Sequence, residues 1–119
     1  NNFHFLGHVS NPIPYLINAN IFIMTSISEG VSRSLMEALY LGKTCIISNI
    51  DGNRELIKDG ENGYLFSDKI MLKTIIAEQL VDGLKVKENL LLKEFRYNIS
   101  INKHKELFKN IYKEKIWKV

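Results

Sequence analysis

The sequence predicts an α/β fold with a parallel sheet of about four strands flanked by helices, followed by further helices. Short apolar runs alternate with helix-like segments over residues 1–68. Two of these runs are apolar throughout, which is typical of parallel strands covered on both faces. From Lys69 onward the pattern is helical only. We therefore divide one domain into an α/β portion, residues 1–68, and C-terminal helices, residues 69–119.

Four segments have the composition of strands. Residues 3–7 read as a strand that ends in a glycine turn, and residues 21–25 and 44–48 are the apolar runs, expected to be buried on both faces. The fourth strand is expected within residues 61–66, where an Asn-Gly turn precedes Tyr-Leu-Phe. Strands that alternate with helices form right-handed parallel crossovers, so a Rossmann-like, doubly wound layer follows.

Helix boundaries between these strands are marked by capping residues. Pro12 lies near the start of one helix, and Ser32 or Val31 lies near the start of the next, which Gly42 stops. A short helix over residues 53–60 is expected to close at Gly60. These assignments place a loop before each helix at the carboxyl end of a strand.

The C-terminal part is helical and basic. The first helix, residues 69–84, has an apolar stripe at positions 72, 75, 76 and 80. Two more helices are expected at residues 85–100 and 102–119, where ten Lys/Arg face four Glu. This tail favours anionic partners, either a membrane surface or an acidic neighbouring domain. No aromatic residues interleave a basic strand surface, so nucleic acid is not expected as a partner.

The amino-acid composition indicates the class of protein and the redox compartment in which it works. The chain has 119 residues, 45% hydrophobic and 24% charged, as in an ordinary globular domain. Its one cysteine, Cys45, is expected to be a buried small hydrophobe, which excludes an internal disulfide and suits a reducing compartment. No leader or apolar run of membrane-spanning length is present. We expect a cytoplasmic location, peripheral to the inner face of the membrane. The opening inside a strand-like segment predicts a piece of a longer protein.

The loop between residues 25 and 33 is the candidate site. It follows an apolar strand and leads into a helix, and helix N-termini attract phosphate through free N–H groups and the helix dipole. Gly30 lets a ligand approach the backbone, Ser32 and Ser34 offer hydroxyl groups, and Arg33 offers a positive charge.

Two glutamates, Glu29 and Glu37, flank this helix start and are separated by seven residues. Carboxylates accept hydrogen bonds from vicinal hydroxyl groups, so the pair suits a ligand with hydroxyl groups on both sides of a diphosphate, such as a nucleotide sugar. The alternative is that Glu29 complements the helix dipole and Glu37 lies on a solvated face. From the residues alone both interpretations stay open.

The motifs in order resemble those of group 1 (family 4) retaining glycosyltransferases of the GT-B fold. The segment SISEGVSRSLMEALYLGKTCIIS is similar to the Glu-x7-Glu region of that family. FHFLGHVS, NANIFIMTS, DGNRELIKDGENGYLF and KHKELFKNIYKE resemble family segments on either side of it, so the likeness covers essentially the whole chain.

The resemblance implies roles for named residues. Glu29 would contact hydroxyl groups of the transferred sugar, which makes it the candidate catalytic residue, and Glu37 would hold the nucleotide ribose. The remaining donor-binding candidates are backbone positions: Gly30, Val31, Ser32 and Arg33 at the sugar and diphosphate, and Gly7, His8 and Val9 near the base. Glu55 is expected to be structural.

The chain departs from the family pattern at several positions. Thr44 replaces a usual proline, Val31 a usual aromatic or leucine, and Asn53-Arg54 an Ile-Pro type pair. The Gly-Arg-Leu and Lys-Gly elements that carry the family's diphosphate-binding Arg and Lys have no match here. The resemblance therefore implies part of a C-terminal donor-binding domain, without the N-terminal acceptor domain, and we expect this chain alone not to transfer sugar.

The implied activity is hexosyl transfer from a nucleotide-diphosphate (NDP) sugar to an acceptor hydroxyl with retention, in polysaccharide, lipopolysaccharide or glycolipid synthesis. No Asp-x-Asp motif occurs and the histidines lack metal-ligand spacing with Cys45, so neither a metal nor another cofactor is expected. The alternative is a non-catalytic Rossmann-like binding module whose amphipathic tail docks on a membrane or a partner.

Overall fold

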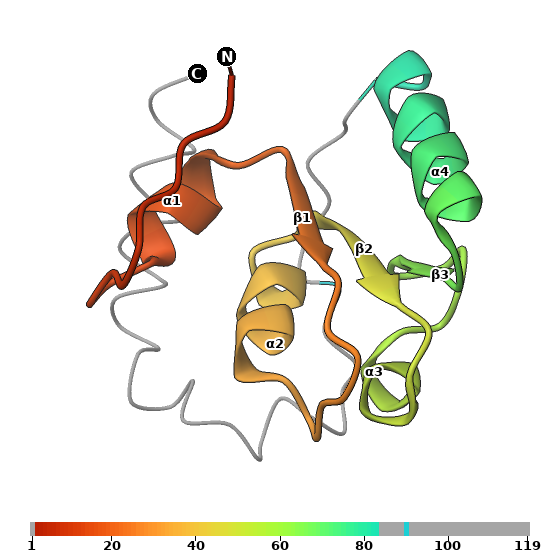
Figure 1. Ribbon diagram of the computed structural model, residues 1–119, viewed down its shortest axis with the longest axis horizontal. Helices are drawn as coiled ribbons and strands as arrows, with labels where there is room; N and C mark the ends of the chain where they lie inside the picture. Colours follow the sequence, from red (N-terminus) through yellow and green to blue (C-terminus); the bar gives the residue numbers. More distant parts are fainter. Residues whose placement is uncertain (1, 84–89, 91–119) are drawn as a thin grey trace.

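A computed structural model describes residues 2–83 and 90. Helices and strands alternate along the chain, and Figure 1 shows α1 and α4 on opposite sides of the molecule, with the sheet and α2 between them. The elements are α1 (Ile13–Asn18), β1 (Ile21–Met24), α2 (Arg33–Tyr40), β2 (Thr44–Ser48), α3 (Asp51–Leu56), β3 (Tyr64–Phe66) and α4 (Lys69–Val81). The predicted α/β class with a parallel sheet is confirmed.

The described sheet has three strands in the order β1-β2-β3, and both pairs are parallel. Ile21 lies opposite Thr44, and Ile46 lies opposite Tyr64. β2 is the central strand, and its three middle residues are buried. Parallel neighbours align their carboxyl ends along one edge of the sheet, so the loops after β1 and β2 lie next to each other.

The hydrophobic core lies where α2 packs on β1 and β2. Burial of apolar surface is the main force that holds such a layer together. β1 contributes only the partly buried Phe22 and Met24 to this core, and α4 contributes none of its residues. The buried core residues are Ile13, Leu16, Leu35, Met36, Ala38, Leu39, Leu41, Cys45, Ile47, Leu56, Ile57 and Leu65.

Both ends of α2 are fixed by the capping residues that the sequence predicts. Ser32 is the N-cap, and its Oγ accepts a hydrogen bond from the Leu35 N–H. At the other end Gly42 has a φ of 68°, a left-handed conformation that glycine adopts without steric cost. The N–H groups of Gly42 and Lys43 donate to the carbonyl oxygens of Leu39 and Ala38, which completes a Schellman motif.

The buried Lys43 joins α1 to the rest of the fold. Its Nζ donates hydrogen bonds to the carbonyl oxygens of Ile17 (2.5 Å) and Ala19 (3.0 Å), at the C-terminal end of α1. These carbonyl groups carry the negative end of the helix dipole, so the ammonium group finds compensation for its lost hydration.

The turn from α3 to β3 is built on two side chains of the Asp-Gly-Glu-Asn-Gly segment. The buried Asn62 donates through Nδ2 to the Leu56 carbonyl oxygen and accepts through Oδ1 from the Lys58 N–H. Asp59 accepts from the Leu65 N–H. α3 therefore ends at Leu56, earlier than predicted, because the Asn62 side chain donates the hydrogen bond that the Leu56 carbonyl group would otherwise accept from a further helical turn. Gly60 lies in the turn that follows.

The strand predicted at residues 3–7 is wrong. Residues 2–9 have no regular structure, and Phe3 and Phe5 are 80% and 98% exposed. Without a partner ladder, an alternating apolar pattern gains little from an extended backbone. β1 is consequently an edge strand among the described residues. Burial of residues 21–25 on both faces is also wrong, since Ile23 is 43% exposed.

α4 confirms the first predicted C-terminal helix, with Asp68 as its N-cap. Its stripe is only partly buried, since Ile75 is buried whereas Leu80 is 60% exposed. The two predicted basic helices and the amphipathic tail lie outside the described residues. None of the helices in the described part of the chain is long and apolar enough to cross a membrane.

Cys45 is fully buried on β2, as predicted, and burial raises the pKa of its thiol from 9.0 to about 12. Above pH 9 the unfolded chain releases this proton while the folded chain keeps it. We therefore expect the Cys45 contribution to lower the free energy of unfolding by about 1.4 kcal/mol per pH unit between these pKa values, and to be constant below them.

Urea denaturation at about pH 8 and about pH 10 measures this slope, with Cys45→Val as the control that removes the thiol. The same pH dependence in both proteins would contradict the prediction.

Candidate functional site

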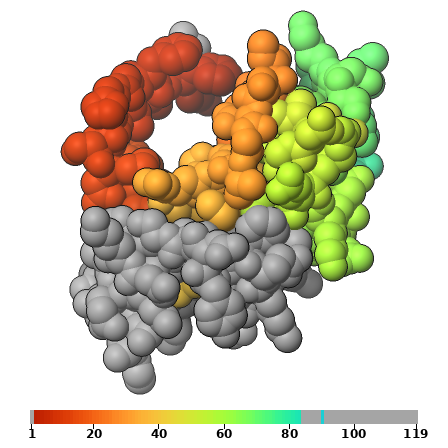
Figure 2. Space-filling model, turned by 90° about the horizontal axis from the view of Figure 1, so that it is seen from below, coloured from red at the N-terminus to blue at the C-terminus, as the bar shows by residue number. Residues whose placement is uncertain are grey.

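A cleft of about 720 Å³ opens between the β1–α2 loop and the start of α1. Figure 2 shows an opening between the N-terminal segment, in red, and the orange part of the chain. The cleft lies at the carboxyl end of β1, where a parallel sheet is expected to hold its ligand. Its walls come from two stretches of the chain: Ser10, Asn11, Pro12, Ile13, and Glu29, Val31, Ser32, Arg33, Ser34, Glu37.

The N-terminus of α2 faces this cleft. The first intrahelical bond runs from the Met36 N–H to the Ser32 carbonyl oxygen, and the Leu35 N–H donates to Ser32 Oγ. Helix geometry therefore leaves the N–H groups of Arg33 and Ser34 for a ligand. Together with the helix dipole, they form a seat for an anion. Ser32 itself is buried and serves mainly as the cap.

Glu29 and Glu37 line the same cleft. Glu29 is exposed, and its Oε1 accepts a 2.8 Å hydrogen bond from Ser26 Oγ. Glu37 is half-buried, one helical turn beyond Arg33, so these two residues share a face of α2. Two carboxylates thus flank a helix N-terminus and a guanidinium group, an arrangement that can bind hydroxyl groups on either side of an anion.

The remaining predicted site residues do not line the cleft. Gly30 is exposed in the loop but does not line the cleft. Gly7, His8 and Val9 do not line it either, and Gly7 and His8 are exposed. The N-terminal wall comes instead from residues 10–13, which sequence reasoning missed. Pro12 gave a usable signal, because the start of a second helix belongs at the same edge of a parallel sheet.

Residues 2–83 and 90 contain no group of three or more His, Cys, Asp or Glu side chains that could hold a metal ion. The residues that line the cleft offer carboxylates, hydroxyl groups and a guanidinium group.

A comparison with protein families identifies the chain. The family described as glycosyl transferases group 1 matches residues 1–100. The chain belongs to the group 1 glycosyltransferases. The resemblance carried by the Glu-x7-Glu segment is thereby confirmed.

Three curated relatives of this group 1 glycosyltransferase chain are themselves named as glycosyltransferases. It is 39% identical over 56 residues to the UDP-Gal:alpha-D-GlcNAc-diphosphoundecaprenol alpha-1,3-galactosyltransferase of Escherichia coli, covering 46% of this chain and 14% of the relative. It is 31% identical over 101 residues to the N,N'-diacetylbacillosaminyl-diphospho-undecaprenol alpha-1,3-N-acetylgalactosaminyltransferase of Campylobacter jejuni, covering 85% and 24%. It is 29% identical over 87 residues to the capsular polysaccharide biosynthesis glycosyltransferase CapM of Staphylococcus aureus, covering 71% and 23%.

The chain spans between 14% and 24% of the length of these three relatives. No solved structure matches this glycosyltransferase chain with significant similarity. The assignment of the cleft and of Glu29 and Glu37 as the candidate site is therefore based on the geometry of this chain.

Proposed function

We propose that this chain is the donor-binding part of a glycosyltransferase that transfers a hexose from a nucleotide-diphosphate sugar to an acceptor hydroxyl with retention. The observation that carries the proposal is that Glu29 and Glu37 line one cleft together with the N-terminus of α2. A ligand with hydroxyl groups on both sides of a diphosphate matches that order of groups.

In the proposed complex the diphosphate lies against the N–H groups of Arg33 and Ser34 and the Arg33 guanidinium group. Glu29 accepts hydrogen bonds from hydroxyl groups of the sugar, and Glu37 accepts them from the ribose. During transfer the bond from the anomeric carbon to the diphosphate oxygen breaks, the acceptor oxygen bonds to that carbon, and the proton of the acceptor hydroxyl passes to the leaving diphosphate. The helix dipole and N–H groups stabilise the negative charge of the leaving nucleoside diphosphate.

The acceptor domain and further diphosphate-binding residues come from other parts of a longer protein, which contacts the membrane peripherally from the cytoplasm. The E. coli and C. jejuni relatives are named for acceptors on diphospho-undecaprenol, which supports a lipid-linked sugar as acceptor. Leaving-group charge is neutralised by the protein, so added chelator should leave the rate unchanged.

Donor binding tests the proposal directly. Calorimetry with UDP-, GDP- and ADP-sugars on the intact enzyme should give saturable binding for one nucleotide, and weak or absent binding for this chain alone. Binding of none of them by the intact enzyme would overturn the proposal.

Glu37→Ala should raise the donor Kd of the intact enzyme by about 10- to 100-fold, because a hydrogen bond to a charged group contributes about 1.5–3 kcal/mol. We expect kcat to change little, since the ribose does not react. Glu78→Ala on α4 removes the same charge outside the cleft and is the control. An unchanged Kd in the Glu37 variant would remove Glu37 from the donor site.

A further inference from the structure

The first turn of α3 is pressed against the backbone of the Glu29 loop. A Cβ atom added at Gly52 would lie 2.3 Å from the carbonyl oxygens of both Glu29 and Gly30. Real Cβ atoms do not approach backbone oxygen this closely, so only glycine fits this contact. The Glu29–Gly30 peptide and α3 therefore share one packed boundary, although more than twenty residues separate them in the sequence.

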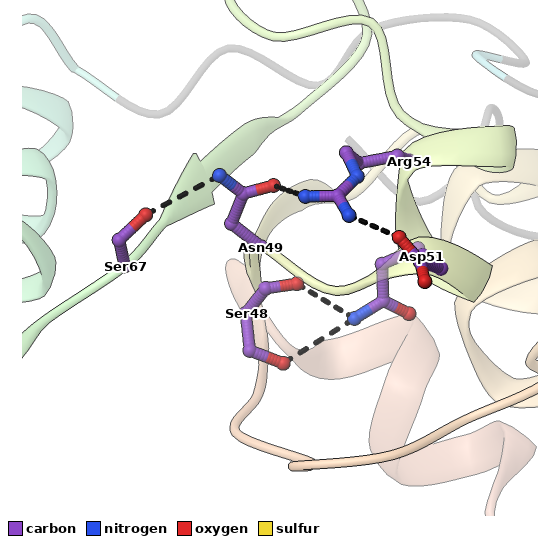
Figure 3. A network of polar contacts seen from close by, with 6 residues as sticks. Ser48, Asn49, Asp51, Arg54 and Ser67 are labelled. Carbon is purple, nitrogen blue, oxygen red and sulfur yellow. Dashed lines mark hydrogen bonds and ion pairs between the residues drawn. The ribbon is translucent and has the colours of Figure 1, made fainter.

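Hydrogen bonds cross the same boundary beside Gly52. Asn53 donates through Nδ2 to the carbonyl oxygen (2.8 Å) and the Oγ (3.3 Å) of Ser48, and both bonds are drawn in Figure 3. Ser48 Oγ then donates to the Ser26 carbonyl oxygen at 2.6 Å. Ser26 Oγ in turn donates to Glu29 Oε1. The hydrogen bonds from α3 thus reach the backbone of Ser26, the residue whose side chain bonds the Glu29 carboxylate.

Asn53 is an unexpected residue for this place if packing alone mattered. It is fully buried, and its Oδ1 has no hydrogen-bond partner within the described structure. An unsatisfied buried acceptor costs about 1–3 kcal/mol, which a leucine of similar size would avoid. The residues next to it in sequence serve a different, exposed network: Arg54 bonds Asn49 and Asp51, and Asn49 bonds Ser67 (Figure 3).

We propose that Asn53 and Ser48 are positioning residues that hold the Ser26–Gly30 loop so that the Glu29 carboxylate stands at the cleft. The proposal rests on the proposed function for its effect on transfer, but not for its effect on the loop. Asn53 orients the Ser48 hydroxyl, and that hydroxyl anchors the Ser26 carbonyl group. These bonds hold the loop at Ser26, beside the place where α3 packs against the Glu29–Gly30 peptide.

Asn53→Leu in the intact enzyme tests this. We expect kcat to fall about tenfold or more, because a small displacement of a group that orients the substrate is costly, with donor Kd within about twofold of the wild type. Tm should equal or exceed that of the wild type, because the unpaired oxygen is gone. Unchanged kcat, or a loss of kcat accompanied by a matching fall in Tm, would overturn the proposal.

If Asn53→Leu does not fold, two variants of Ser48 test the same proposal. Ser48→Ala removes the anchoring hydroxyl and should lower kcat, whereas Ser48→Thr keeps a hydroxyl and should restore it. Arg54→Ala disrupts only the exposed network and should leave kcat and donor Kd unchanged. Equal kcat for the alanine and threonine variants would contradict a positioning role.

Hydrogen exchange separates this proposal from the proposed function. Amide exchange in the peptide that covers residues 24–31, measured by mass spectrometry without any sugar, should be faster in Asn53→Leu than in wild type and Arg54→Ala. A wild type that transfers no sugar would refute the proposed function, while faster exchange in this peptide would still support the positioning role. Equal exchange in all three proteins would refute the positioning role alone.

Discussion

Glu29→Ala in the intact enzyme is expected to lower kcat by about 100-fold, with a small change in donor Kd. The Glu29 carboxylate stands at the mouth of the cleft, and Ser26 Oγ already fixes one of its oxygens. If it accepts two hydrogen bonds from the sugar, each contributes about 1.5–3 kcal/mol, and the part realised only in the transition state appears in kcat. Steady-state kinetics with saturating acceptor measures the change.

Two variants sharpen this result. Glu29→Gln keeps the size of the side chain and one acceptor oxygen but removes the charge, so it should retain more activity than alanine. Glu78→Ala on α4 removes an acid outside the cleft and should behave as wild type. A Glu29→Ala enzyme with wild-type kcat would exclude Glu29 from the reaction, whatever its contribution to binding.

Gly52→Ala is expected to lower the free energy of unfolding by about 3 kcal/mol or more. The added methyl group would lie 2.3 Å from two carbonyl oxygens, and backbone atoms cannot rotate away as a side chain does. Either α3 or the Glu29–Gly30 loop must shift, so donor binding should weaken in parallel. Urea denaturation monitored by circular dichroism measures the loss of stability.

Gly30→Ala is the matched control, because the same methyl group at Gly30 meets no atom within 4 Å. Its free energy of unfolding should stay within about 0.5–1 kcal/mol of the wild type, with a small gain if the unfolded chain loses freedom. Equal stability of the two alanine variants would mean that the α3 contact gives way at little cost.

Local chemistry explains which parts of the fold the sequence predicts well. α2 is bounded as expected because Ser32 and Gly42 act on their own neighbours, through a side-chain bond and a backbone conformation. β2 follows from an apolar run that needs burial on both faces. Glu29 and Glu37 share a cleft because both belong to one loop and helix, so their spacing in sequence carries over to space.

Features that depend on distant partners were not predictable in the same way. Residues 3–7 alternate like a strand, yet a strand also needs a neighbouring ladder, and their own composition does not supply one. The family resemblance predicts Gly7, His8 and Val9 near the nucleotide base, and the N-terminal wall of the cleft is formed by residues 10–13. The contact of Gly52 with the Glu29 loop is equally invisible in sequence, because its second half lies more than twenty residues away.

The hydrogen bonds from Lys43 to α1 affect the position of a wall of the cleft. Lys43 grips the trailing end of α1, next to Ile17 and Ala19, while the leading end at Pro12 and Ile13 forms one side of the cleft. The buried ammonium group of Lys43 thus holds the C-terminal end of α1, and through it the position of the N-terminal end that lines the cleft. The width of the cleft therefore depends in part on Lys43, a residue that follows α2 and does not itself line the cleft.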